Sequence, residues 1–380
     1  MICKPVINII SLLDMLDLHR IPLKGTHFVS NGEFPLAYGI SDQSSPVDQV
    51  VDLLRVKAEQ GFFNSVLKQH GAIILRLGNS DPDVISKYVS SIGVGCGDSI
   101  FHSLGYDEER TKVTDALRKR EEGVNNTKIL QRNECSRFVK YPTKIFLACT
   151  KANAEGGEIS LAHGHEIFQR LQKKAPILVT ELSKRGLYLE QTWNNEGPSH
   201  MVWSSKECFG KYIKDDDSMD ERKRKAEKLV IEYISPYFRW DKNTNLIVEE
   251  HLKPLRVYEN ENKIYGVWFN DVCAICGGEE GEAFGRVSKV AYDDDKSPIS
   301  EYNLDAILHC SLESEYNCQL QEGDILMVDN RQVSYGRNSW KNGEREILMS
   351  SWDTPGKPQF NEWVKPDNYI GTRDAPIDQC

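Results

Sequence analysis

Long hydrophobic segments are missing from this sequence. The apolar runs are short, such as AIILRL at 72–77 and KIFLACT at 144–150, whereas a membrane-spanning helix needs about 20 apolar residues. The first residues are interrupted by Pro5, Asp14 and Asp17, which is poor for the apolar segment of a signal peptide. We therefore expect no membrane association and a cytoplasmic location.

The chain also lacks an excess of positive charge. Its 47 Lys and Arg residues are outnumbered by 57 Asp and Glu residues, which gives a net charge of −10. Such a field repels nucleic acid and anionic membranes. The basic run ERKRKAEK at 221–228 follows the acidic run DDDSMD and predicts a solvated helix face. The net negative charge shows no docking surface for an aminoacyl-tRNA, so whether such a partner binds is unknown. The oligomeric state is unknown as well.

Nucleotide-binding loops and a complete zinc motif are absent as well. Neither GxGxxG nor GxxxxGK[ST] occurs, which excludes the usual phosphate-binding loops. Ten cysteines are scattered along the chain, a pattern typical of reduced thiols rather than disulfides. Cys273 and Cys276 form one CxxC pair, but no second pair or histidine cluster has the spacing that zinc requires. An accidental match is favoured over a metal or redox site.

The hydrophobic pattern predicts strands in both halves of the chain, with helices before and between them. Helical spacing covers 47–69, and a second helix has Asp81 as its N-cap, Pro82 at its first position and Gly93 at its end. The further predicted elements are a helix at 163–176 ended by Pro176, a hairpin at 255–270 turning at ENEN, a helix near 304–314, and strands at 72–77, 144–150, 158–162, after Gly323 and at 345–352.

Strands and helices do not alternate regularly, so a parallel doubly wound sheet is disfavoured. An antiparallel barrel or sandwich with helices packed outside fits better. We expect an α+β protein with a mostly β core, forming a single domain over 1–380. Within it we expect an N-terminal helical part at 1–69, a helical insert at 177–245 and a C-terminal tail at 353–380.

Four blocks of the sequence, in this order, resemble the TauD/TfdA-like superfamily and in particular its clavaminate-synthase-like branch. The blocks are RNECSRFVKYPTKIFLAC, AEGGEISLAHGHEIFQRL, KIYGVWFN and EGDILMVDNRQVSYGRNSWKNGEREIL. In outline the match extends over residues 70–352. The resemblance implies a double-stranded β-helix, or jelly roll, with flanking helices. It also implies an activity that depends on iron(II) and 2-oxoglutarate, because most members are oxygenases of that kind.

Members of this branch hold iron with two histidines and one carboxylate, and the resemblance assigns these positions residue by residue. Glu134 keeps the family's spacing to Pro142 and matches the carboxylate. Arg132 stands at the first histidine position and Tyr335 at the second. Arg345 matches the arginine that binds 2-oxoglutarate.

The replaced ligands disfavour ordinary iron chemistry. Arginine has no acceptor lone pair and stays protonated, so Arg132 cannot ligate iron. Its charge, about 4 Å from a dication, would be repelled by roughly 8 kcal/mol at an effective dielectric constant near ~20. Ile159 stands where the family has a threonine that helps to hold the co-substrate. We therefore expect no metal ion and no cofactor, neither iron nor 2-oxoglutarate.

The remaining residues predict a pocket for a small-molecule, amino-acid-like substrate. Arg132, Tyr335 and Arg345 would bind a carboxylate or carbonyl group, with Glu134 as a general base or ammonium partner. The alternative is that Arg132 only fills a vacated metal position by pairing with the carboxylate. Arg337 is a candidate second cation in the pocket or a residue at its rim.

Three other positions have candidate roles. Trp268 is expected to face the pocket as part of the barrel wall, although aromatic residues there are usually core. His163 and His165 form an HxH pair at the start of a predicted helix, where capping or packing is favoured over metal ligation. Asp329 and Asn330 are expected to brace the end of a strand.

The resemblance leads to three hypotheses. The first is a metal-free enzyme of secondary-metabolite biosynthesis that acts on an amino-acid-like compound. Similarity to a fungal branch, the yeast proteins of pulcherrimin formation, implies a cyclodipeptide such as cyclo-dileucine as its product. The second is an Fe(II)/2-oxoglutarate-dependent oxygenase with altered ligands. The third is a non-catalytic pseudoenzyme that binds a small molecule. Fold similarity alone does not decide between them.

Overall fold

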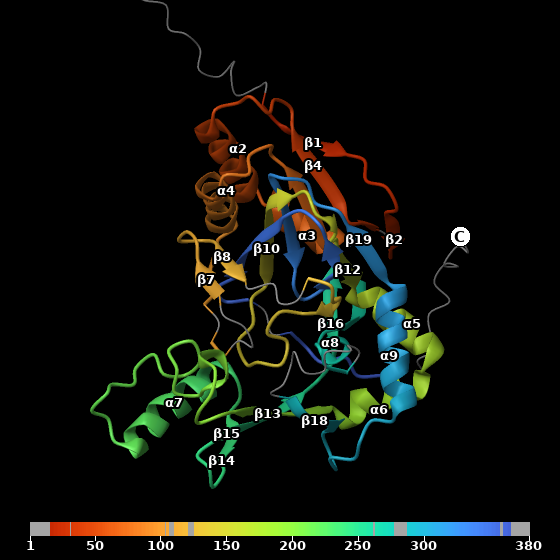
Figure 1. Cartoon of the computed structure of the whole chain (residues 1–380). Coiled ribbons are helices and arrows are strands. Elements are labelled where there is room, and N and C mark those ends of the chain that lie inside the picture. Colours follow the sequence, from red (N-terminus) through yellow and green to blue (C-terminus); the bar gives the residue numbers. More distant parts are fainter. Residues whose placement is uncertain are drawn as a thin grey trace, which may run out of the picture.

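The computed structural model describes residues 16–365 except 31, 103, 106–109, 121–124, 261–262, 277–286 and 358–359. Residues 1–15 of the predicted N-terminal part, the second half of the predicted ENEN turn and the last part of the predicted tail lie outside the described residues. Helices and strands carry the labels of Figure 1.

Two β-sheets face each other at the centre of the molecule (Figure 1). The larger sheet has the order β1-β4-β5-β20-β10-β23-β8-β7, with β6 beside β23, and the smaller has the order β19-β12-β21-β9. The strands of the larger sheet are β1 (Leu18–Ile21), β4 (Leu36–Ile40), β5 (Ala72–Arg76), β6 (Ser99–Ile100), β7 (Arg110–Lys112), β8 (Arg118–Arg120), β10 (Lys144–Ala152), β20 (Asp324–Asp329) and β23 (Arg345–Asp353). Those of the smaller sheet are β9 (Ile129–Arg132), β12 (Ile159–His163), β19 (Glu315–Cys318) and β21 (Val333–Arg337).

The chain passes back and forth between these sheets. β10, β20 and β23 lie in the larger sheet, while β12 and β21 cross to the smaller one. Neighbouring strands are antiparallel, except for the parallel pair β4 and β5. One buried cluster between the sheets includes Ile145, Leu147, Leu161, Val328 and Val333. This arrangement is the double-stranded β-helix, or jelly roll, and the predicted α+β class with a mostly β core is confirmed.

Helices cover the outer face of the larger sheet. They are α2 (Val47–Glu59), α3 (Phe62–His70) and α4 (Pro82–Gly95), and α2 and α4 lie side by side in Figure 1. β10 is therefore buried on both faces, which explains why KIFLACT is continuously apolar rather than alternating. The helical spacing over 47–69 is confirmed, although Gly61, with φ of 79°, separates α2 from α3.

Another group of helices packs on the outer face of the smaller sheet. These helices are α5 (Gly164–Lys174), α6 (Pro176–Arg185), α8 (Val272–Cys276) and α9 (Glu301–Glu313). Pro176 ends the predicted helix and then occupies the first turn of α6, where its missing N–H is tolerated. Within the described residues, no helix has both the length and the apolar character to cross a membrane.

A four-stranded sheet extends from the jelly roll at the bottom of Figure 1. It has the order β14-β15-β13-β18, and α7 (Met219–Tyr233) packs against it. Its strands are β13 (Leu187–Trp193), β14 (Tyr237–Trp240), β15 (Leu246–Leu252) and β18 (Val287–Tyr292). The segment 177–245, expected as a helical insert, therefore contains strands as well as helices.

Short elements complete the described chain. The predicted hairpin is confirmed by β16 (Leu255–Asn260) and β17 (Lys263–Trp268). Two further pairs are β2 (His27–Val29) with β3 (Gly32–Phe34), and β11 (Glu155–Gly156) with β22 (Trp340–Lys341), and one 3₁₀ turn covers Ser199–Met201.

The helix α4 is held on the larger sheet by a close approach at Gly93. The predicted N-cap is confirmed, because the Asp81 side chain accepts hydrogen bonds from the backbone N–H groups of Asp83 and Val84. Near the other end, a Cβ atom at Gly93 would lie 2.5 Å from ring carbons of Trp352 in β23. Only a residue without a side chain lets the helix lie this close to the indole.

We expect Gly93→Ala to lower the free energy of unfolding by about 1 to 3 kcal/mol, because the added methyl group overpacks the contact with Trp352. Urea denaturation monitored by circular dichroism measures the change. Val94→Ala is the control, since this neighbouring side chain is 66% exposed and its loss should change stability by less than about 0.5 kcal/mol. An unchanged midpoint for Gly93→Ala would contradict this packing.

Candidate active site

The first predicted site segment lies at the edge of the smaller sheet. Arg132 is the last residue of β9 and is paired in register with Tyr335 of β21. Glu134 follows in a turn rather than in the strand, and Cys135 within that turn has φ of 54°. The turn, not an extended strand, therefore sets the direction of the Glu134 side chain relative to Arg132.

Asn330 fixes the backbone on both sides of Glu134. Its Oδ1 accepts a hydrogen bond from the Glu134 N–H at 2.7 Å, and its Nδ2 donates to the Glu134 carbonyl at 2.9 Å and to that of Pro142 at 2.8 Å. Asp329 accepts a hydrogen bond from the Tyr258 hydroxyl at 2.7 Å. The prediction that Asp329 and Asn330 brace the strand end is confirmed.

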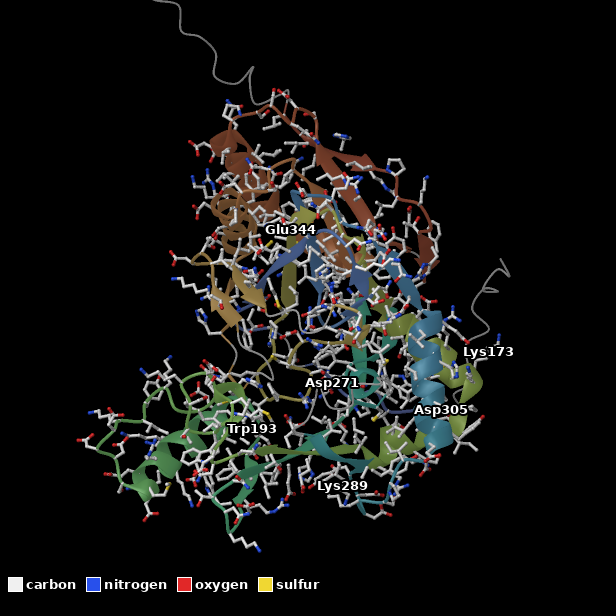
Figure 2. The ribbon with its side chains drawn as sticks, viewed as in Figure 1. Lys173, Trp193, Asp271, Lys289, Asp305 and Glu344 are labelled. Atoms are coloured by element: carbon white, nitrogen blue, oxygen red, sulfur yellow. The ribbon has the colours of Figure 1, made fainter. Side chains whose placement is uncertain are left out.

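Two asparagines without a recognisable motif add to this brace. The side chain of Asn133 donates to the Asn330 carbonyl at 2.8 Å, and its Oδ1 accepts from the Asn270 N–H at 3.2 Å. Asn270 is followed by Asp271, whose carboxylate pairs with the buried Arg137 at 2.6 Å. Figure 2 places Asp271 beside α8 in the interior of the molecule. The only sequence signal for Asn133 is its place between the two predicted site residues.

Glu134 and Tyr335 meet in the interior. The Tyr335 hydroxyl donates a hydrogen bond to Glu134 Oε2 at 2.5 Å, and both side chains are buried. Charge-assisted hydrogen bonds from a hydroxyl to a carboxylate are short and strong. The structure therefore brings together the carboxylate position and the second histidine position of the family motif.

A cavity opens beside this pair, between the two sheets. It contains about 540 Å³ of empty space, part of which is open to solvent. Its lining combines three arginines with one phenol and apolar side chains: Arg132, Arg337, Arg345, Tyr335, Ile129, Leu147, Ile159, Gly336, Ile347 and Met349. No carboxylate belongs to this described lining. Three guanidinium groups therefore line one cavity in a protein whose net charge is negative.

The Gly-Gly turn before β12 positions Arg345. The Arg345 Nε donates to the Gly157 carbonyl at 2.7 Å. Gly157 has φ of 74°, and a Cβ atom there would lie 2.6 Å from Arg345 Cδ. Across the cavity, Arg337 donates to the Thr127 carbonyl at 2.9 Å. Both guanidinium groups are thus oriented by backbone carbonyls.

The other predicted residues lie elsewhere. Trp268 is buried at the end of β17 in the apolar cluster around α5 and α6, and it is not part of the described lining of the arginine cavity. His163 caps α5, because its Nδ1 accepts from the His165 N–H at 3.2 Å, and His165 Nδ1 bonds the Gly266 carbonyl at 2.8 Å. These contacts support the capping and packing roles over metal ligation.

The CxxC pair forms part of the short helix α8. Burial raises the pKa of Cys273 to about 12 and that of Cys276 to about 11, so both thiols stay protonated at neutral pH. A protonated thiol is neither a strong nucleophile nor a metal ligand. The interpretation of Cys273 and Cys276 as an accidental motif match is in line with this.

We expect Asn330→Ala to lower the free energy of unfolding by about 3 kcal/mol, because buried backbone groups of Glu134 and Pro142 lose their partners. Thermal and urea unfolding of the purified variant measure this loss. Asn243→Ala, at an exposed turn residue, is the control and should change stability by less than about 0.5 kcal/mol. Equal stability of the two variants would show that Asn330 braces nothing.

Burial lowers the pKa of His163 to about 3, with a smaller contribution from the neighbouring His165 that Glu166 opposes. In the unfolded chain the same imidazole has a pKa of about 6.5. Acid therefore protonates the unfolded form first and favours unfolding. Between about pH 8 and about pH 5 we expect this residue alone to cost about 2 kcal/mol of stability. His163→Asn keeps a capping oxygen and should show that much less acid sensitivity in urea titrations. An identical pH profile for both proteins would contradict the buried, neutral imidazole.

Comparison with known proteins gives a consistent result. The family described as "Taurine catabolism dioxygenase TauD, TfdA family" matches residues 34–352. A clavaminate synthase-like protein of Arabidopsis thaliana is 23% identical over 306 residues, covering 78% of this chain and 85% of that protein. An asparagine oxygenase in complex with Fe(II), 2S,3S-3-hydroxyasparagine and succinate has a TM-score of 0.45 at 13% identity, covering 81% and 83% of the two chains. PvcB from Pseudomonas aeruginosa has a TM-score of 0.45 at 11% identity, covering 89% and 91%.

The family match corrects two expectations. Dioxygenases of this family use iron and 2-oxoglutarate, so the expectation of no cofactor is wrong, and so is the hypothesis of a metal-free biosynthetic enzyme. The comparisons give no support to a fungal branch, pulcherrimin formation or cyclodipeptide synthesis. The physical reason is that the charge of one replaced ligand, Arg132, does not decide whether a protein of this family uses its cofactors.

The family's usual ligand set nevertheless does not fit this chain. Arg132 and Tyr335 replace the two histidines, and within the described residues no three His, Cys, Asp or Glu side chains gather to hold a metal. Glu134 and Tyr335 are the oxygen donors that remain. With its match over residues 34–352 and its jelly-roll core, the chain belongs to the TauD/TfdA dioxygenase family.

Proposed function

We propose that this protein is a 2-oxoglutarate-dependent oxygenase of altered type, in which three arginines bind the co-substrate. The observation that carries the proposal is that Arg132, Arg337 and Arg345 line one cavity between the sheets without a carboxylate in its described lining. 2-Oxoglutarate is a small dianion with a carboxylate at each end. A guanidinium pairs with a carboxylate through two parallel hydrogen bonds.

The placement of the arginines supports this ligand over a neutral one. Arg345 and Arg337 come from adjacent regions of the two sheets, and Ile159 of β12 lies in register with Arg337. Apolar side chains such as Ile347 and Met349 complete the walls. A low-dielectric wall strengthens charge pairing, so two anchored carboxylates with a short apolar linker suit this cavity.

The altered ligand set has a consequence for iron. Glu134 and Tyr335 are the residues that would hold it, and iron with 2-oxoglutarate supplies the oxidant for hydroxylation when both are bound. Arg132 opposes a dication, whereas a bound dianion attracts one. We therefore propose that iron affinity is low in the unliganded protein and rises when 2-oxoglutarate occupies the arginine cavity.

The substrate of the proposed reaction is a small amino-acid-like compound. Supporting this, the guanidinium groups of the lining suit a carboxylate.

Anaerobic titration with 2-oxoglutarate, with and without Fe(II), tests the proposal. We expect 2-oxoglutarate to bind the wild-type protein, and Arg345→Ala to weaken that binding at least about tenfold, because one charge-assisted carboxylate contact is lost. Arg224→Ala, on the exposed face of α7, is the matched control. With air and Fe(II), succinate should form in the wild type and control.

Two results would contradict the proposal. One is the absence of 2-oxoglutarate binding to the wild-type protein by calorimetry. The other is binding that proceeds normally while no succinate forms under any iron concentration, which would leave a receptor rather than an oxygenase. Stronger iron binding in the absence of 2-oxoglutarate than in its presence would refute the proposal that bound 2-oxoglutarate raises the affinity for iron.

A further inference from the structure

A second cavity lies at the opposite end of the strands that form the arginine cavity. In the register between β12 and β21, Ile159 faces Arg337 at one end and His163 faces Val333 at the other. Four strand steps correspond to roughly 13 Å. Between these ends, Leu161 is completely buried in the core cluster that Val333 also joins. The two cavities are therefore separate.

This second cavity is polar and basic. It contains about 490 Å³ of empty space, part of it open to solvent. Its lining comes from β2, β3, α3, β12, α5, β17 and the adjoining loops and consists of Val29, Ser30, Gly32, Lys68, Gln69, His163, His165, Asn260, Lys263, Tyr265, Val267 and Gln332. This described lining contains two lysines and no acidic side chain. The whole chain has a net charge of −10, so the charge of this lining is opposite in sign to that of the protein.

The two lysines reach the cavity from different elements. Lys68 comes from the last turn of α3 and Lys263 from the start of β17. Within the described residues, neither ammonium group pairs with a carboxylate. The Lys68 backbone is fixed, because its carbonyl accepts hydrogen bonds from Asn260 and Gln332. In the part of the chain that the structure describes, two ammonium groups without a carboxylate partner therefore lie at one cavity.

His163 contributes a buried donor to the same space. Its Nδ1 accepts the His165 N–H, so in the neutral ring the proton is on Nε2. The residue is only 6% exposed and its side chain lines the cavity, so a ligand in the cavity can accept a hydrogen bond from Nε2.

Gln332 supplies an acceptor whose orientation is fixed. Its Nε2 donates to the Leu67 carbonyl at 3.0 Å and to Asp329 Oδ2 at 3.1 Å. The opposite atom, Oε1, is therefore the acceptor that remains at the cavity. Tyr265, whose ring stacks edge-on against His165 with centroids 4.9 Å apart, and Val267 provide an apolar wall.

From these contacts we propose that the second cavity is a binding site for a small organic anion, whose carboxylate or phosphate oxygens pair with Lys68 and Lys263 and accept a hydrogen bond from His163 Nε2. The body of the ligand packs on Tyr265 and Val267. This site is independent of the arginine cavity, so the proposal does not rest on the proposed oxygenase activity.

Calorimetric titration of the full chain at low ionic strength tests this site with two probes, inorganic phosphate and benzoate. Binding of benzoate but not phosphate indicates an aromatic or apolar carboxylate, and the reverse indicates a phosphorylated compound. We expect Lys68→Gln with Lys263→Gln to weaken binding at least about tenfold, because both charge pairs are lost. In this double variant, added salt should weaken the remaining probe binding only slightly, because the two lysine charges that salt would screen are absent.

Two controls locate the site. Lys228→Gln removes an exposed lysine of α7 and should leave probe affinity unchanged. In Arg345→Ala, probe binding to the arginine cavity should weaken, while the binding event that depends on Lys68 and Lys263 should remain. A double lysine variant that binds the probes as the wild type does, an Arg345→Ala variant that loses all probe binding, or no binding of either probe would each overturn the proposal. Both lysines are exposed, so their replacement should not unfold the protein. Circular dichroism of the double variant verifies that it is folded.

Discussion

The hydrogen bonds of Asn330 determine the geometry of the candidate site. One amide side chain holds the backbone N–H and carbonyl of Glu134 and the carbonyl of Pro142. It thereby ties the turn after β9 to the connection between β20 and β21. Tyr335 lies on β21, so the same connection carries the phenol to the Glu134 carboxylate. Without these hydrogen bonds, the turn would lose contacts that hold it in the conformation that directs the Glu134 side chain to the interior.

Much of the fold could be predicted because its signals are local. Asp81, Pro82 and the apolar spacing define α4 within a few residues, and the long apolar run of KIFLACT marks a strand buried on both faces. The residues Glu134, Tyr335 and Arg345 were placed by motif spacing, and the structure brings all three to one region. These three residues lie close together because of the order of the strands in the two sheets. A family resemblance predicts that order, whereas amino-acid composition does not.

What could not be predicted depends on contacts between distant segments. The strand β13 inside a charged, partly helical-looking segment is stabilised by pairing with β15 and β18, which come much later in the chain. The second cavity combines Lys68, His163 and Lys263 from elements that have no common sequence signal. The use of iron and 2-oxoglutarate also could not be predicted from Arg132, because one replaced ligand does not show what the other side chains of the site provide.

The arginine cavity also affects the energetics of the protein itself. Three guanidinium groups line one partly buried space, where charge pairing is stronger than in water. An anion that binds there would stabilise the native state in proportion to its concentration and affinity. The measured stability of the protein would then depend on which organic acids are present in its buffer.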